Sequence, residues 1–106
     1  MQIYPRFKLW LEDAEGRFLL GEGTCELLEH IRSTGSLSDA ARKSGISYAH
    51  AWKKIRKLER NLDTKLVDRS RGGSGGGSST LTEDGLSLLE RFKSIEERMN
   101  ETIGRL

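Results

Sequence analysis

Residues 36–62, SLSDAARKSGISYAHAWKKIRKLERNL, contain the pattern that decides the fold. The first four have the form of a capping box, Ser-x-x-Asp, which starts a short helix of about residues 37–44. Gly45 suits the left-handed backbone position that follows the last turn of such a helix. A second helix begins after Ser47 and runs to Leu62. Two helices joined by so short a glycine-containing turn predict a helix-turn-helix.

The second helix of this unit has an apolar side and a basic side. On a helical wheel the apolar side gathers Tyr48, Ala51, Trp52, Ile55, Leu58 and Leu62. The opposite side carries Ala49, His50, Lys53, Lys57 and Arg60, with Lys54 and Arg56 at its borders. We expect Ala51 and Ile55 to anchor the helix and Trp52 to lie in the core. The basic side then projects outward, where a helix fits the major groove of B-DNA.

The distribution of charge supports a polyanionic partner. The formal net charge is only +2. Residues 36–71 nevertheless hold 10 basic and 4 acidic groups, whereas residues 1–35 and 72–106 each hold 4 basic and 6 acidic groups. A basic middle between acidic ends indicates one surface that meets the partner.

A basic helix side is often only a solvated surface. Here it follows a capped helix and a glycine turn and precedes a strand-loop-strand, which makes the DNA-binding interpretation the stronger one. Residues near the start of the second helix read bases in such folds, so we predict base contacts for Ser47, Ala49, His50 and Lys53. We predict phosphate contacts for Ser36, Lys54, Lys57 and Arg60.

Residues 65–82 predict a wing, with a strand from Lys65 to Ser70 and a return strand at Thr80-Leu81. The loop between them is rich in glycine, whose backbone approaches a phosphate closely. We therefore add phosphate contacts at Arg69, Arg71, Gly73 and Gly75. The loop lacks the G-x-x-x-x-G-K-[ST] pattern of a nucleotide-binding loop. A hairpin tip that does not touch DNA is the alternative.

The two ends of the chain predict further elements. Residues 1–20 alternate in part, with Ile3, Phe7, Leu9 and Leu11 on one face, and indicate a β-hairpin. Thr24 is the expected cap of a helix that continues to about Ser33. Thr82 is the expected cap of a long last helix, residues 83–106, whose apolar positions resemble a coiled-coil seam. We predict that this seam forms a dimer interface through Leu88, Phe92, Ile95, Met99, Ile103 and Leu106.

Other chemistries find little support in the sequence. The single cysteine, Cys25, excludes an internal disulfide and a multi-cysteine zinc site, and we expect it to be a buried, inert thiol. His30 and His50 have no companion at metal-ligand spacing. We therefore expect no metal, no cofactor and no enzyme. No apolar run or leader pattern predicts a membrane segment, so the expected location is the cytoplasm.

The stretches GSLSDAARKSGISYAHAWKKIRKLE and LVDRSRGGSGGGSSTLTEDGLSLLERF resemble the N-terminal DNA-binding domain of ModE-type, molybdate-responsive transcriptional regulators, which are relatives of LysR-type regulators. The resemblance rests on the Gly-Ile-Ser-Tyr link, Ala51-Trp52, the Leu-Val-x-Arg strand, the glycine-rich wing and the Leu-Thr-x-x-Gly helix entry. It covers about residues 24–95. It implies a winged helix-turn-helix, a homodimer built through helices outside the DNA-reading unit, and a two-fold symmetric operator. Regulators of this type continue into a molybdate-binding domain, and we do not extend molybdate sensing to these 106 residues.

The expected fold is mainly α with small β-hairpins, a single winged helix-turn-helix domain over residues 1–106 in the order β-β-α-α-α-β-β-α. The expected function is sequence-specific binding of double-stranded DNA by a homodimer that regulates transcription. Two alternatives stay open: a winged-helix module that binds an acidic protein, and a small oxyanion sensor with the glycine loop as its site.

Overall fold

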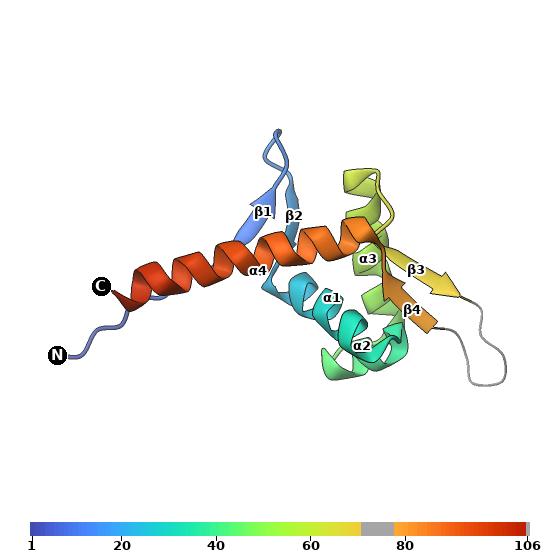
Figure 1. Ribbon diagram of the computed structural model, residues 1–106, viewed down its shortest axis with the longest axis horizontal. Helices are drawn as coiled ribbons and strands as arrows, with labels where there is room; N and C mark the ends of the chain where they lie inside the picture. The colour runs from blue at the N-terminus through green and yellow to red at the C-terminus, as the bar shows by residue number, and fades with distance from the viewer. Residues whose placement is uncertain (71–77, 106) are drawn as a thin grey trace.

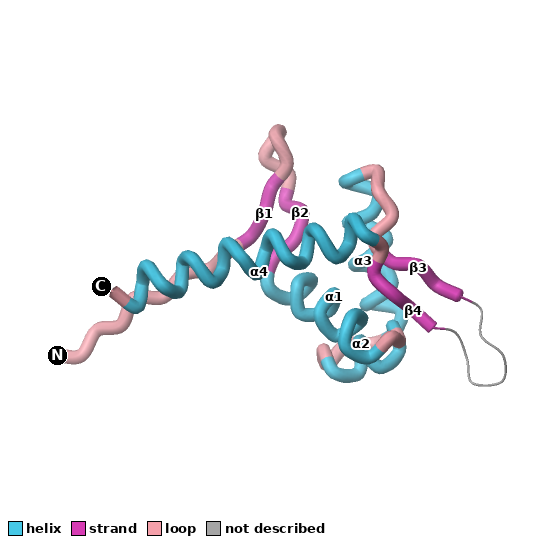
Figure 2. The backbone as a smooth tube through the Cα atoms, in the orientation of Figure 1, coloured by secondary structure: helices cyan, strands magenta, loops and turns pink. Residues whose placement is uncertain are grey.

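The computed structural model describes residues 1–70 and 78–105. Its elements follow one another in the expected order β-β-α-α-α-β-β-α (Figure 1). They are β1 (Trp10–Glu12), β2 (Phe18–Gly21), α1 (Glu22–Thr34), α2 (Leu37–Lys43), α3 (Tyr48–Leu62), β3 (Val67–Ser70), β4 (Ser78–Leu81) and α4 (Glu83–Gly104). The strands form two separate antiparallel pairs, β1 with β2 and β3 with β4, so the molecule is mainly helical as predicted (Figure 2).

One apolar core lies where the four helices meet. Its largest fully buried side chains come from β2, α1, α3, the α3–β3 junction, the start of β3 and α4: Leu20, Leu27, Leu28, Ile31, Ile55, Leu58, Leu66, Val67, Leu89 and Phe92. Ala40 and Ala41 of α2 and Ala51 of α3 are buried where these two helices approach each other. Small side chains at this contact allow α3 to pack closely on α2, which fixes the angle at which α3 leaves the body.

Three of the four helices begin with a hydroxyl cap. The Oγ of Ser36 accepts the Asp39 N–H at 3.1 Å, and the Oγ1 of Thr82 accepts the Gly85 N–H at 3.0 Å. Both predicted caps are confirmed, and each satisfies a donor that a helix start leaves free. Gly45 has a φ of +72°, which confirms the left-handed turn between α2 and α3. Only the serine half of the capping box is formed. The carboxylate of Asp39 pairs instead with Arg42, at 3.2 Å.

The prediction that Thr24 caps the first helix is wrong. β2 leads directly into α1, whose N-cap is Gly21, and no side-chain hydrogen bond caps it. Thr24 therefore lies inside the first turn and is 8% exposed. The two glycines at 21 and 23 favour a turn in the sequence, whereas in the structure α1 begins directly after β2.

The N-terminal hairpin is shorter than predicted. β1 starts at Trp10, and Ile3 is 74% exposed instead of lying on a strand face. β2 has four residues and offers pairing only to Trp10, Leu11 and Glu12. The preceding residues therefore have no strand partner among the described residues.

α4 is covered along its first half and projects from the body along its second half (Figure 1). At its start a Cβ on Gly85 would overlap the backbone oxygen of Leu66, so only glycine permits this close approach. Leu89 and Phe92 are buried in the core. Farther along, Met99 is 39% exposed.

The buried position of Phe92 corrects its assignment to a dimer interface. Its side chain is 0% exposed because it lies in the core of its own chain, so it has no surface to offer to a second copy. Leu88 is partly buried against the same core. Leu106 lies outside the described residues.

Candidate nucleic-acid interface

The inner side of α3 anchors the candidate interface. Ala51, Ile55 and Leu58 are buried in the core, as predicted for the apolar side of this helix. The helix starts after Ser47, whose Oγ accepts the His50 N–H at 3.1 Å. Asp63 closes it in the left-handed conformation, with a φ of 49°. Both ends and the inner side of α3 are therefore fixed, which holds its outer side in one position.

The outer side of α3 is open to solvent. Every predicted base-contact residue is exposed on or next to this helix: Ser47, Ala49, His50 and Lys53. Lys57 and Arg60, predicted to contact phosphates, are exposed farther along the same helix. The structure thus brings these six residues together along one helix, and their individual contacts with DNA remain predictions.

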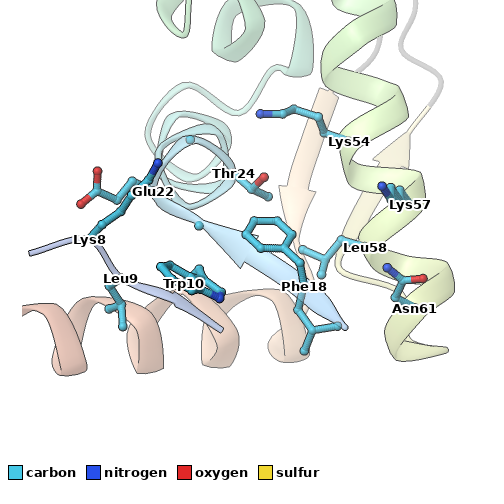
Figure 3. Close-up of a pocket in the computed structure, with 13 residues that line it drawn as sticks. Lys8, Leu9, Trp10, Phe18, Glu22, Thr24, Lys54, Lys57, Leu58 and Asn61 are labelled. Atoms are coloured by element: carbon cyan, nitrogen blue, oxygen red, sulfur yellow. The ribbon is translucent and has the colours of Figure 1, made fainter. Parts of the chain in front are cut away.

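Two predicted phosphate contacts are placed differently. Lys54 is half-buried, and its Nζ would lie 3.4 Å from a Cβ placed on Gly23, so the ammonium rests beside the first turn of α1. Figure 3 shows Lys54 reaching from α3 toward that turn. Ser36 is also half-buried, because its hydroxyl is used as the cap of α2. Arg71, Gly73 and Gly75 lie outside the described residues.

The wing strands are joined to α3 by a carboxylate that the sequence analysis missed. The Oε2 of Glu59 accepts the Leu66 N–H at 2.8 Å and the Val67 N–H at 3.2 Å. β4 is tied to the body in turn, since the Ser79 N–H donates to the Gly35 oxygen at 2.8 Å. These bonds fix where the β3–β4 pair leaves the body relative to α3. The pairing from Val67 with Leu81 to Ser70 with Ser78 then extends the wing.

A cluster of one arginine and two aromatic rings also joins the wing to α3. The Cζ of Arg69 lies 4.6 Å from the centroid of the Trp52 ring and 5.6 Å from that of Tyr48. One Nη of Arg69 also donates a hydrogen bond to the Tyr48 hydroxyl. Arg56 lies over the tryptophan ring as well, 5.4 Å from the centroid of Trp52. Attraction of a guanidinium to an aromatic face orders the arginine next to the exposed side of α3.

This cluster corrects two predictions. Tyr48 is 42% exposed rather than part of the apolar side, and Trp52 is half-buried at the edge of the core. Both rings are turned toward the wing, where the guanidinium of Arg69 lies over them. The sequence contains these arginines and aromatic residues, but Tyr48 and Arg69 are 21 positions apart. That separation does not show which arginine meets which ring.

The cysteine is buried, as predicted. Cys25 is 7% exposed, and burial raises the pKa of its thiol to about 11. The thiol is therefore protonated near neutral pH and is a poor nucleophile. Within residues 1–70 and 78–105, no three His, Cys, Asp or Glu side chains gather as metal ligands would. Of the helices in this part of the chain, none combines the length and the apolar composition needed to cross a bilayer.

Comparison with known proteins agrees with this geometry. Residues 24–86 match the family of bacterial regulatory helix-turn-helix proteins, lysR family. The chain is 41% identical over 71 residues to the DNA-binding transcriptional dual regulator ModE of Escherichia coli (strain K12). It is 33% identical over 87 residues to the molybdenum-pterin-binding protein MopA of Rhodobacter capsulatus. These matches cover 67% and 82% of this chain, and 27% and 33% of the two relatives.

Solved structures show the same fold. The DNA complex of the CbnR DNA-binding domain matches with a TM-score of 0.62 at 24% identity, covering 79% of this chain and 92% of that one. MepR, a transcription regulator of the Staphylococcus aureus multidrug efflux pump MepA, matches with a TM-score of 0.67 at 23% identity. That match covers 82% of this chain and 66% of MepR. The predicted winged helix-turn-helix is thereby confirmed.

The chain spans about a quarter of the length of the ModE protein that it matches. The resemblance to ModE-type regulators is confirmed over this part, and the family match covers the helix-turn-helix, the wing and the start of α4. The chain belongs to the lysR family of bacterial regulatory helix-turn-helix proteins.

Proposed function

We propose that the chain binds double-stranded DNA in a sequence-specific manner and regulates transcription as a homodimer in the bacterial cytoplasm. In this proposal α3 enters the major groove, and the β3–β4 wing lies against the adjacent backbone or minor groove. Ser47, Ala49, His50 and Lys53 contact bases, while Lys57 and Arg60 contact phosphates. Membership in a family of regulatory helix-turn-helix proteins supports this proposal.

The observation that carries the proposal is the exposed outer side of α3. A helix whose inner side, N-cap and C-cap are all fixed presents its outer side without reorganisation when it binds. The cations Lys53, Lys57 and Arg60 are exposed on this side. Salt bridges within the described residues involve none of these three. They are therefore available to neutralise phosphates and release counterions.

A second copy of the chain is proposed to pack against the projecting half of α4. Met99 is exposed there, and Ile95 and Ile103 are half-buried. Figure 1 places both termini at this end of the long axis, and Ile3 and Tyr4 are 74% and 64% exposed. Contact between two such apolar ends would pair two α3 helices for half-sites about 34 Å apart, one turn of B-DNA.

Selection of bound duplexes from a random pool, followed by titration of the recovered sequence, tests this function. We expect a two-fold symmetric site that binds more tightly than a scrambled duplex of equal length. His50→Ala or Lys53→Ala should change the preferred sequence, with a loss of about 1–3 kcal/mol for the wild-type site. Recovery of no preferred sequence, together with tight binding to an acidic protein, would support a protein-interaction module instead.

A further inference from the structure

A pocket of about 520 Å³ lies between the N-terminal hairpin, the start of α1 and the second half of α3 (Figure 3). We call it the hairpin pocket. Its walls include Leu9, Trp10, Phe18, Thr24, Leu58 and the charged residues Lys8, Glu22, Lys54 and Lys57. The volume is in the range of pockets that hold small organic molecules. None of the described wing residues, 65–70 and 78–82, lines these walls.

The start of α1 provides hydrogen-bond donors to this pocket. α2, α3 and α4 each begin with a hydroxyl that accepts a first-turn N–H, whereas no side chain caps α1 at Gly21. The first N–H groups of a helix attract anions through both hydrogen bonding and the helix dipole. Gly21 and Gly23 line the pocket at this point, and neither has a side chain that would cover the backbone.

Thr24 gives a second and independent indication of a ligand. Its side chain is 8% exposed, and no side-chain hydrogen bond in the described part of the chain involves its hydroxyl. In the same part of the chain every fully covered side-chain nitrogen or oxygen has a partner, so the unpaired Thr24 oxygen must open to a surface. That surface is the hairpin pocket, which Thr24 lines, and Figure 3 shows the hydroxyl on the side that faces Lys54 and Lys57. This hydroxyl opens to the pocket and has no protein partner in the described residues, so it can bond to a molecule that enters there.

The other walls define the chemistry of that partner. The ammonium of Lys54 rests beside Gly23, at the positive end of α1, where a cation is disfavoured unless an anion joins it. Glu22 lies near Lys8, away from Lys54 and Lys57 (Figure 3). Trp10 and Phe18 are 47% and 56% exposed, and Figure 3 shows both rings at the pocket. Three lysines, one glutamate and two accessible rings favour an organic anion that carries an apolar group.

We propose that the hairpin pocket binds a small aromatic carboxylate. The carboxylate accepts hydrogen bonds from Thr24 and from the first turn of α1, and it pairs with Lys54. The aromatic group lies against Trp10 and Phe18. Binding itself is independent of the proposed function. Its effect on DNA rests on that function, since the pocket is also lined by Lys57, which we assign to a phosphate.

Isothermal titration of the full chain with naphthalene-2-carboxylate tests the pocket. We expect saturable binding, and binding of the neutral naphthalene-2-carboxamide should be at least about tenfold weaker because it lacks the charge. Thr24→Val keeps the shape of the side chain and should weaken the carboxylate about tenfold. Thr102→Val makes the same change on an exposed part of α4 and should leave the affinity unchanged.

Phe18→Ala provides a test that leaves the buried core untouched. Its exposed ring lines the pocket, so its loss should also weaken naphthalene-2-carboxylate severalfold, whereas Tyr4→Ala, an exposed ring outside the pocket, should not. Absence of saturable binding, or equal affinities in wild type and Thr24→Val, overturns the proposal. Equal binding of inorganic phosphate also overturns it, because the pocket would then take any oxyanion, including a backbone phosphate of DNA.

Measuring duplex binding alongside carboxylate binding tests the pocket and the proposed function separately. Naphthalene-2-carboxylate should weaken duplex binding by wild type, and Thr24→Val should need about ten times more of it for the same effect. In wild type the duplex should weaken carboxylate binding by the same factor. Duplex binding without carboxylate binding refutes only the pocket. Carboxylate binding without duplex binding refutes only the DNA-binding function.

Discussion

α3 and α4 are both amphipathic helices, but they leave opposite kinds of surface exposed. α3 buries Ala51, Ile55 and Leu58 over its length and leaves a basic side in solvent. α4 buries Gly85, Leu89 and Phe92 in its first half, then projects beyond the core with Met99 exposed. A core of this size covers α3, which has 15 residues, but only the first half of α4, which has 22.

The difference indicates two kinds of partner. An exposed row of lysines on a fixed helix favours a polyanion, whose binding releases counterions. An apolar stripe beyond the core favours another apolar surface, because burial from water is the main driving force there.

The two halves of α4 should differ most in stability. Phe92→Ala should lower the free energy of unfolding by about 3–5 kcal/mol, because it opens a cavity in the core. Met99→Ala, in the projecting half, should change it by less than about 1 kcal/mol at concentrations where the chain is monomeric. Denaturant unfolding checks both, and equal losses would mean that α4 has no covered half.

The close approach at the start of α4 should also be sensitive. Gly85→Ala places a Cβ against the backbone oxygen of Leu66 and should cost about 1–3 kcal/mol. Gly104→Ala is the matched control, because a Cβ there meets no atom within 4 Å. It should be neutral or slightly stabilising, since alanine favours a helix over glycine. Thermal unfolding of the two variants side by side measures the difference.

The projecting half of α4 should control self-association. Met99→Glu places a charge on the proposed dimer surface and should weaken the dimer at least about tenfold. Met99→Leu keeps the surface apolar and should preserve it. Sedimentation equilibrium over a range of concentrations gives the dissociation constants. A dimer that is unaffected by Met99→Glu would place the interface elsewhere.

The link between α3 and the wing should have the smallest effect. Arg69→Leu removes the guanidinium from Trp52 and Tyr48 and should cost about 0.5–1 kcal/mol, as expected for an exposed cation–π contact. Arg91→Leu removes an exposed arginine of α4 that lies over no ring in the described part of the chain. It should have no comparable effect. The change in tryptophan fluorescence, present only in Arg69→Leu, reports loss of the contact.

Local signals in the sequence predicted the DNA-reading unit well. The Ser36 and Thr82 caps, the left-handed Gly45 and the buried anchors of α3 depend on residues within a few positions, and all are confirmed. The contacts of Glu59 with the start of β3 and of Arg69 with Tyr48 were missed, because they depend on how the wing returns to α3. Phe92 was wrongly assigned to the dimer interface for a similar reason. The spacing of apolar residues along α4 does not show which of them the core of the same chain covers.

The placement of Lys54 shows the same limit. A wheel puts it at the border of the basic side, and only the packing of α1 against α3 turns its ammonium toward Gly23. The hairpin pocket follows from that packing, so no part of it was predicted. Its residues come from the hairpin, the start of α1 and α3, which are far apart in the sequence.

The most direct test of the basic side of α3 is the salt dependence of duplex binding by wild type, Lys57→Ala and Arg98→Ala, followed by fluorescence anisotropy. We expect log affinity to fall linearly with log salt concentration. Lys57→Ala should flatten that slope by about one unit, while Arg98→Ala, on the projecting half of α4, should leave it unchanged. Identical slopes for all three proteins, or binding that ignores salt, would contradict the claim that α3 lies against DNA.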